Sequence, residues 1–104
     1  IKFSKSSGIY EALKIQAVAG EYNIPCMIGG MLESRLALAA KVHFAYAAPN
    51  VKFYDLDTCL VGHLEDPVLG GITYNGYEIT VTDDLGIGAD IRKEFLDKCE
   101  SWVI

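Results

Sequence analysis

The spacing of apolar residues changes several times along the first half of the chain, and each change predicts a new element. Residues 1–3 alternate apolar and charged side chains as a strand does, whereas residues 9–22 place apolar or small side chains every three or four positions, which is typical of a helix. A short apolar run at residues 26–28, after Pro25 and before a glycine pair, predicts a fully buried strand. The chain therefore begins as strand, helix, strand.

The same two spacings recur further along the chain. Residues 34–48 repeat the helical interval and are rich in alanine, so that this helix is able to lie close against a sheet. Pro49 and Asn50 end it, and residues 51–56 alternate again as a third strand. Strands that alternate with helices of this length indicate parallel pairing through right-handed crossovers, which makes the fold class α/β.

The pattern differs beyond the third strand. Residues 58–71 are expected to form a loop, and two short strands at 72–74 and 77–81 flank Asn75-Gly76, which is the strongest short signal for a β-hairpin. A terminal helix is predicted over residues 90–102.

Asp90 is the expected N-cap of this terminal helix. Its apolar stripe consists of Ile91, Phe95, Cys99 and Trp102.

Composition and charge exclude several classes of function. The 104 residues are 51% hydrophobic and 22% charged, as in one packed domain. With 14 acidic and 9 basic residues and a net charge of −5, the chain lacks the basic cluster that nucleic acids and anionic lipids require, so we expect no nucleic-acid partner. No apolar run approaches the ~18 residues of a membrane span, so we expect no membrane association.

The cysteines and histidines give no motif of their own. Cys26, Cys59 and Cys99 are widely spaced and odd in number, which favours reduced, buried thiols in a cytoplasmic protein. His43 falls on the alanine-rich face of its helix and is interpreted as a core histidine with its hydrogen bonds satisfied. His63 lies in the predicted loop without a partner motif.

Lys2 is the first candidate for chemistry. It lies between Ile1 and Phe3 and is predicted to point to the opposite face of the strand from both. A solvated edge lysine is one interpretation. The other is a functional lysine, because a lysine in a crowded interior is costly unless it pairs or titrates.

Asp55 and Asp57 are the second candidate. They stand two residues apart at the end of the third strand, so they are predicted to project from one face while Leu56 points the other way. A strand end that feeds a turn often carries aspartate, and this explanation remains open beside a functional one. The functional alternative is a site for a cation, either a metal ion with a further ligand or an ammonium group.

Two polar or flexible dipeptides are weaker candidates. Gly29-Gly30 permits close approach of the backbone to a ligand, but it lacks the spacing of a dinucleotide or phosphate cradle. Ser6-Ser7 precedes the first helix and is interpreted as a cap rather than an anion site.

Five segments together resemble the enolase superfamily, and within it the dipeptide epimerases of the L-Ala-D/L-Glu epimerase type. They are Ile-Lys-Phe-Ser-Lys-Ser-Ser-Gly-Ile at 1–9, Cys-Met-Ile-Gly-Gly-Met-Leu-Glu-Ser at 26–34, Ala-Lys-Val-His-Phe-Ala at 40–45, Tyr-Asp-Leu-Asp at 54–57 and Gly-Gly-Ile-Thr-Tyr-Asn-Gly at 70–76. No single segment is specific, and the resemblance, which covers about residues 1–88, depends on their joint spacing.

The resemblance implies that the chain is the C-terminal portion of a (β/α)7β TIM-type barrel and begins inside its sixth strand. Residues 1–70 would then supply the last three barrel strands with their helices. Residues 71–104 would be the hairpin and terminal helix that return to the capping domain. The remainder of the barrel and the capping domain would be partners of this segment, and a homo-oligomer is left open.

The resemblance also implies a function. A dipeptide epimerase inverts an α-carbon by 1,1-proton transfer through an enolate, with Mg²⁺ as cofactor and two general acid/bases. Lys2 would be one of these bases, and Asp55 with Asp57 would bind the substrate ammonium. Gly30 and Leu32 would border the substrate side chains, and the metal ligands would precede residue 1. Glu33 would be either a structural carboxylate or one that supports the residues in contact with the substrate.

Two alternatives remain from the sequence. The first keeps the superfamily but assigns a cycloisomerase or N-acylamino acid racemase activity. The second treats the chain as a non-catalytic α/β binding module, which its length allows.

Overall fold

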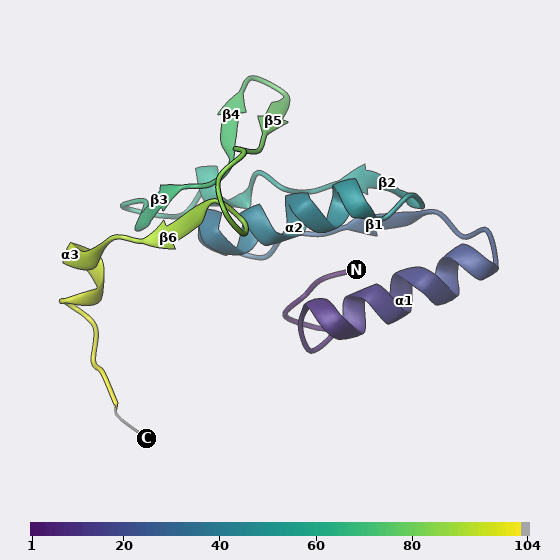
Figure 1. Cartoon of the computed structure of the whole chain (residues 1–104), viewed down its shortest axis with the longest axis horizontal. Helices are drawn as coiled ribbons and strands as arrows, with labels where there is room; N and C mark the ends of the chain where they lie inside the picture. The colour runs from purple at the N-terminus through teal and green to yellow at the C-terminus, as the bar shows by residue number, and fades with distance from the viewer. Residues whose placement is uncertain (103–104) are drawn as a thin grey trace.

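The structure is a computed structural model that describes residues 1–102. Its first half contains the helix α1 (Ile9–Glu21), the strand β1 (Cys26–Ile28), the helix α2 (Arg35–Ala47) and the strand β2 (Val51–Tyr54). Its second half contains a 3-10 turn η1 (Thr58–Leu60), the strands β3 (Val68–Gly70), β4 (Thr73–Asn75), β5 (Glu78–Thr80) and β6 (Ala89–Ile91), and the short helix α3 (Lys93–Leu96). Figure 1 shows this order along the chain.

The strands β1 and β2 form a parallel pair, as the alternation of strands and helices predicts. Cys26 lies opposite Val51 and Ile28 lies opposite Tyr54, with a register shift after Cys26. The α2 helix connects the two strands and covers one side of them (Figure 1). This arrangement brings the chain segments that follow β1 and β2 to the same end of the pair.

Residues 1–3 do not form the predicted strand. Ile1 does lie beside β1, because its amino group donates to the carbonyl of Met27 (2.5 Å) and its carbonyl accepts from the amide of Gly29 (2.7 Å). The chain then turns at once, since the carbonyl of Lys2 accepts from the amides of Lys5 and Ser6, both at 2.9 Å. One residue bonded in this way is too few for a strand. The chain at Ile1 nevertheless runs parallel to β1, as expected.

The hydrophobic core lies between α2 and the β1–β2 pair, and α1 contributes a single buried residue, Ala12. On one side of the core the ring of Phe3 meets that of Phe44 edge to face, at a centroid distance of 5.3 Å. The other buried apolar members are Cys26, Ile28, Leu38, Ala39, Val42, Ala48, Val51, Leu56 and Ile72.

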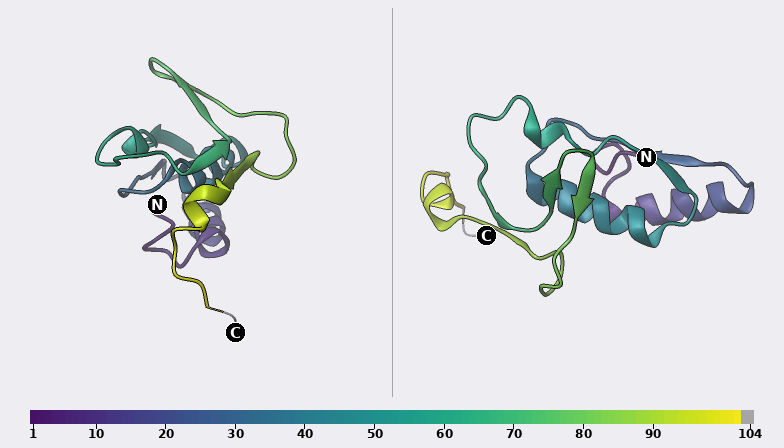
Figure 2. Two further views of the ribbon diagram at one scale, coloured as in Figure 1. Left: turned by 90° about the vertical axis from the view of Figure 1, so that its left-hand side faces the viewer. Right: turned by 90° about the horizontal axis from the view of Figure 1, so that it is seen from above.

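The predicted hairpin is present, with its turn shifted by one residue. Asn75 pairs with Glu78, so the two turn residues are Gly76 and Tyr77 rather than Asn75-Gly76. Gly76 has a φ of 60°, and glycine at the first turn position is what a type II′ turn takes. Figures 1 and 2 show that this hairpin projects from the body of the molecule.

The predictions for 58–71 and 90–102 are partly wrong. The segment 58–71 contains η1 and β3, and β3 pairs antiparallel with β6, whose last two residues the sequence pattern assigned to the terminal helix. Asp90 therefore lies in a strand, and Arg92 occupies the N-cap of a helix of only four residues. Trp102, the last residue of the predicted apolar stripe, is 83% exposed.

Two further findings concern the whole described segment. No helix within residues 1–102 combines the length and the apolar character needed to cross a membrane. The three cysteines carry free thiols, but only Cys26 is buried, while Cys59 is half-buried and Cys99 is exposed. The prediction that all three are buried is therefore wrong for Cys99, because the terminal helix ends at Leu96, before this residue.

Candidate functional site

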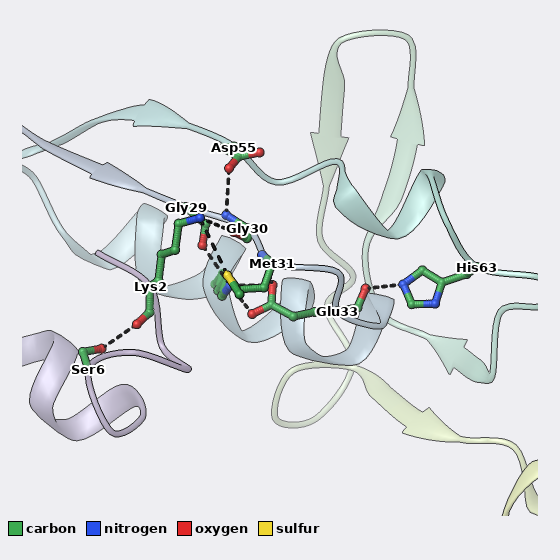
Figure 3. A network of polar contacts seen from close by, with 9 residues as sticks. Lys2, Ser6, Gly29, Gly30, Met31, Glu33, Asp55 and His63 are labelled. Atoms are coloured by element: carbon green, nitrogen blue, oxygen red, sulfur yellow. Dashed lines mark hydrogen bonds and ion pairs between the residues drawn. The ribbon is translucent and has the colours of Figure 1, made fainter.

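Three segments meet at the carboxyl end of the β1–β2 pair. They are the turn that follows residue 1, the loop 29–33 after β1, and the residues after β2. Figure 3 shows Lys2, Gly30 and Asp55 linked there by hydrogen bonds. In parallel α/β folds this is the end of the strands where ligands bind.

Lys2 reaches across to the loop after β1. Its Nζ donates to the carbonyl oxygen of Gly30 at 2.7 Å and lies 3.8 Å from the Sδ of Met31 (Figure 3). The side chain passes directly over Gly29, where an added Cβ would lie 2.9 Å from the Cε of Lys2. Gly29 therefore leaves room for the lysine stem, and Lys2 is half-buried rather than fully solvated.

Asp55 engages the same loop from the other strand. Its Oδ2 accepts from the backbone amide of Gly30 at 3.1 Å, and its own amide donates to the carbonyl of Ile28 at 3.0 Å. Gly30 is thus bound at its carbonyl by Lys2 and at its amide by Asp55. Because Oδ1 of Asp55 makes no hydrogen bond within residues 1–102, one carboxylate oxygen remains available to a ligand.

Asp57 differs from Asp55 in its surroundings. Leu56 between them is buried at 5% exposure, as the alternation predicts, but Asp57 lies beyond the strand at the N-cap of η1 and is exposed. Its backbone carbonyl accepts from the amide of Leu60 at 2.9 Å. The two carboxylates therefore lie on one segment without forming a symmetrical pair.

Leu32 and the loop around His63 border this region. Leu32 is 70% exposed, and its Cδ2 would lie 3.1 Å from a Cβ added to Gly62. The Nε2 of His63 lies 3.0 Å from the carbonyl oxygen of Glu33 (Figure 3). The loop after β1 thus packs against the loop after η1.

Sequence reasoning missed a buried ion pair beneath the loop. Lys41 is completely buried, and its Nζ lies 2.5 Å from both carboxylate oxygens of Glu33 and 2.9 Å from the carbonyl of Gly29. The Oε2 of Glu33 also accepts from the amide of Met31 at 3.0 Å. Glu33 therefore holds the loop after β1 in place, which agrees with either of the two roles expected for it. A lysine among alanines on the inner face of a helix was the available signal.

Arg35 is a second missed residue. Its guanidinium donates to Oδ2 of Asp66 at 2.7 Å, to the carbonyls of Val68 and Ile72 at 2.9 Å each, and to the carbonyl of Gly70. These contacts fasten the start of α2 to β3 and the residues on either side of it. Nothing in the sequence around Arg35 indicates these contacts, since each acceptor lies more than 30 residues further along the chain.

Tyr74 ties the hairpin to the segment that carries the aspartates. Its hydroxyl donates to the carbonyl of Leu56 at 2.5 Å and accepts from the Sγ of Cys59 at 3.2 Å. Burial, followed by the hydrogen bond and charge of Cys59 and the charge of Asp57, raises the pKa of Tyr74 far above its ordinary value, whereas Arg35 lowers it slightly.

Three buried polar side-chain atoms lack partners among the described residues, and one of them is the Oγ1 of Thr82. The Nε2 of His43 has none, so the expectation of a satisfied core histidine is wrong for this nitrogen. The Oγ1 of Thr58, directly after Asp57, has none either. An unpaired buried polar group costs about 1–3 kcal/mol, which calls for an explanation at each position.

The described residues do not fit a Mg²⁺ site. No group of three or more histidine, cysteine, aspartate or glutamate side chains within residues 1–102 could hold a metal ion. Asp55 is bound to an amide, and Glu33 is neutralised by Lys41. Mg²⁺ prefers several oxygen ligands in octahedral geometry, which these side chains do not assemble.

Comparison with known proteins gives a consistent result. The model of the family described as Enolase C-terminal domain-like matches residues 1–95. The D-Ala-D/L-Ala epimerase of Cytophaga hutchinsonii is 41% identical over 101 residues, which are 96% of this chain and 27% of that protein. The L-Ala-D/L-Glu epimerase of Bacillus subtilis is 39% identical over 89 residues, 85% of this chain and 24% of that protein.

A solved structure agrees with the sequence relatives. The dipeptide epimerase from Cytophaga hutchinsonii, complexed with Mg and the dipeptide D-Ala-L-Val, superposes with a TM-score of 0.88 at 41% identity. The match covers 95% of this chain and 27% of that one. The chain thus spans about a quarter of the length of the relatives it matches. Its α/β fold is that of the C-terminal part of the barrel in these enzymes, as the sequence predicts.

Proposed function

Because the chain belongs to the Enolase C-terminal domain-like family, we propose that it acts as the C-terminal part of a metal-dependent dipeptide epimerase. The observation that carries this proposal is the double engagement of Gly30, whose carbonyl binds Lys2 and whose amide binds Asp55. A basic group and an acidic group are thereby held on either side of one short backbone segment. A substrate that carries both an acidic C–H bond and a cation suits this arrangement.

Lys2 is proposed as one of two general acid/bases. Epimerisation requires removal of an α-proton on one face of the carbon and delivery of a proton on the other, so two such groups must flank it. In the neutral amine one N–H of Lys2 bonds to the Gly30 carbonyl, which leaves the lone pair of Nζ free to accept the proton. The second base lies outside this chain in our proposal.

Asp55 and Asp57 are proposed to bind the substrate ammonium. The Oδ1 of Asp55 and the exposed carboxylate of Asp57 supply negative charge beside the loop 29–33. Gly30 and Leu32 would border the substrate side chains, with Leu32 at the rim because it is largely exposed. This set distinguishes free dipeptides from N-acylated amino acids, which carry no ammonium.

The remaining parts of the proposal concern what completes the enzyme. Mg²⁺ would be held by residues outside this chain, and it would supply positive charge to the oxygens of the deprotonated substrate. Residues 1–70 would complete the barrel, and residues 71–104 would return toward a capping domain. We place the activity in the cytoplasm, in keeping with three free thiols.

The proposal is tested with a longer protein that joins this chain to the missing barrel strands and the capping domain. Purified with Mg²⁺, it should exchange the α-proton of dipeptides with solvent deuterium and invert that centre, as followed by NMR and polarimetry. The substitution Asp55→Asn should raise KM for free dipeptides about 10- to 100-fold, because a charge-assisted hydrogen bond is worth ~1.5–3 kcal/mol.

N-acetylated dipeptides provide the control, since they lack the ammonium. Their turnover should be low in the parent and insensitive to Asp55→Asn. Equal turnover of free and acetylated dipeptides by the parent would instead support an N-acylamino acid racemase or a cycloisomerase. Loss of bound Mg²⁺ in Asp55→Asn would show that this residue is a metal ligand.

A further inference from the structure

Gly30 has a steric environment unlike that of its neighbour Gly29. A Cβ on Gly30 would lie 2.6 Å from the Cγ2 of Thr58, 2.9 Å from its Oγ1 and 3.0 Å from the carbonyl oxygen of Asp55. A Cβ on Gly29 would instead meet the flexible stem of Lys2. Neither Gly29 nor Gly30 has a positive φ. A side chain at either position is therefore excluded by neighbouring atoms and not by the backbone conformation.

The γ atoms of Thr58 thus occupy the space that a side chain at position 30 would need. Thr58 begins η1 and follows Asp57 directly, so its backbone is placed by the segment that carries both proposed ammonium ligands. Gly30 is placed by its bonds to Lys2 and Asp55. The contact between the two residues therefore lies within the candidate site.

The hydroxyl of Thr58 does not account for the presence of this residue. Its Oγ1 is buried and has no hydrogen-bond partner in the described part of the chain. A buried hydroxyl without a partner destabilises a fold, and an atom with no exposed surface cannot touch a ligand that lies over Gly30. What remains is the volume and shape of the side chain.

We propose that Thr58 is a specificity-determining residue, which forms the wall over Gly30 that limits the side chain of the substrate's amino-terminal residue. This inference rests on the proposed dipeptide epimerase function. The ammonium and the side chain of that residue share one α-carbon. A group bound at Asp55 therefore brings the side chain within a few ångströms of Gly30, to which the Asp55 carboxylate is itself bonded.

A double-mutant cycle in the longer protein tests the contact without relying on activity. Gly30→Ala should lower the Tm by at least about 3 °C, because overpacking against fixed γ atoms is destabilising. In the background of Thr58→Ala the same change should have little effect on Tm. Gly29→Ala is the matched control: Thr58→Ala should not relieve it, since Lys2 limits the space there.

Specificity is measured with dipeptides whose amino-terminal residue grows from alanine to leucine at constant second residue. Thr58→Ala should shift the ratio of kcat/KM toward the larger side chains by about tenfold, as expected for a pocket that gains a methyl-sized space. Thr58→Val keeps the shape and removes the hydroxyl, and it should retain the preference of the parent.

The outcomes separate the two proposals. A parent protein that epimerises no dipeptide contradicts the proposed function, while the Tm cycle still reports on the contact. An active parent in which the two substitutions are additive in Tm, or in which Thr58→Ala leaves the preference unchanged, overturns the role of Thr58. A changed preference in Thr58→Val overturns it as well, because the hydroxyl would then be what matters.

Discussion

Lys2 is held at the candidate site by a hydrogen bond from its Nζ to the carbonyl of the loop that it faces. Its proposed role as an acid/base can therefore be tested by a substitution that leaves the fold in place. In the longer protein, Lys2→Ala should lower epimerisation by at least about 100-fold, because a positioned general acid/base contributes ~10²–10⁴-fold. Exchange of the α-proton with deuterium should survive for one stereoisomer, since the second base acts on the other face. The measurement is NMR-detected exchange for each stereoisomer.

Lys5→Ala is the control for this prediction, as Lys5 is an exposed lysine of the same turn. It should retain the activity of the parent. Undiminished epimerisation by a folded Lys2→Ala protein would remove Lys2 from the mechanism.

The candidate residues were predictable to different degrees, for a physical reason. Lys2 and Asp55 stand beside short apolar segments, and the parallel order of those segments brings their ends together. Lys41 and Arg35 have long side chains whose partners depend on how α2 packs, which the helical spacing of its own residues does not determine. The contact between Gly30 and Thr58 likewise depends on how the loop after β1 and the segment after β2 lie in the fold, which the sequence does not reveal.

Among the elements, those with a clear period were predicted well. The α1 and α2 helices and the β1 and β2 strands fall within the predicted ranges because each repeats its spacing or is bounded by proline or glycine. The β3 and β6 strands have three residues each and depend on pairing across some 20 residues, so no local pattern marks them. The apolar stripe at 90–102 was misleading, since part of it belongs to β6.

The docking of the β4–β5 hairpin depends on the protonated hydroxyl of Tyr74. The unfolded chain releases this proton near pH 10, whereas the folded chain holds it to higher pH because its pKa is raised by burial. The folded state therefore binds more protons above pH 10, and the free energy of unfolding falls as the pH rises further. Urea unfolding of the longer protein at pH 8 and pH 11 measures this effect.

Substitution of Tyr74 shows whether this residue causes the pH dependence of the free energy of unfolding. Tyr74→Phe should cost about 1 kcal/mol at pH 8, through loss of the bond to Leu56, and less at pH 11. Tyr77→Phe is the control, because Tyr77 is fully exposed in the hairpin turn and should change neither value. An unchanged pH slope in Tyr74→Phe would contradict the prediction.

At the scale of the whole molecule, the chain exposes more surface than its mass explains. Its accessible surface is 7381 Å², about 1,600 Å² above the ~5,800 Å² expected of a compact monomer of this mass. The radius of gyration of 14.7 Å also exceeds the ~13 Å of a compact domain. Met27, Phe53 and Tyr54 on the two parallel strands are each between 46% and 60% exposed.

We therefore expect the 104-residue chain by itself to associate. Sedimentation velocity should show concentration-dependent oligomers, and a dye that binds apolar surface should fluoresce with it more than with the longer protein. A monomer that unfolds cooperatively and binds no dye would contradict this expectation and favour the self-contained binding module.

Arg35 has a consequence for how the β3 strand avoids unwanted pairing. The backbone of Pro67 and Gly71 bonds toward β6, so by antiparallel alternation the carbonyls of Val68 and Gly70 face the opposite edge. Arg35 donates to both. One guanidinium thus takes the place of a neighbouring strand at this edge of β3. It also places a charge on an edge that could otherwise pair with a strand of another chain.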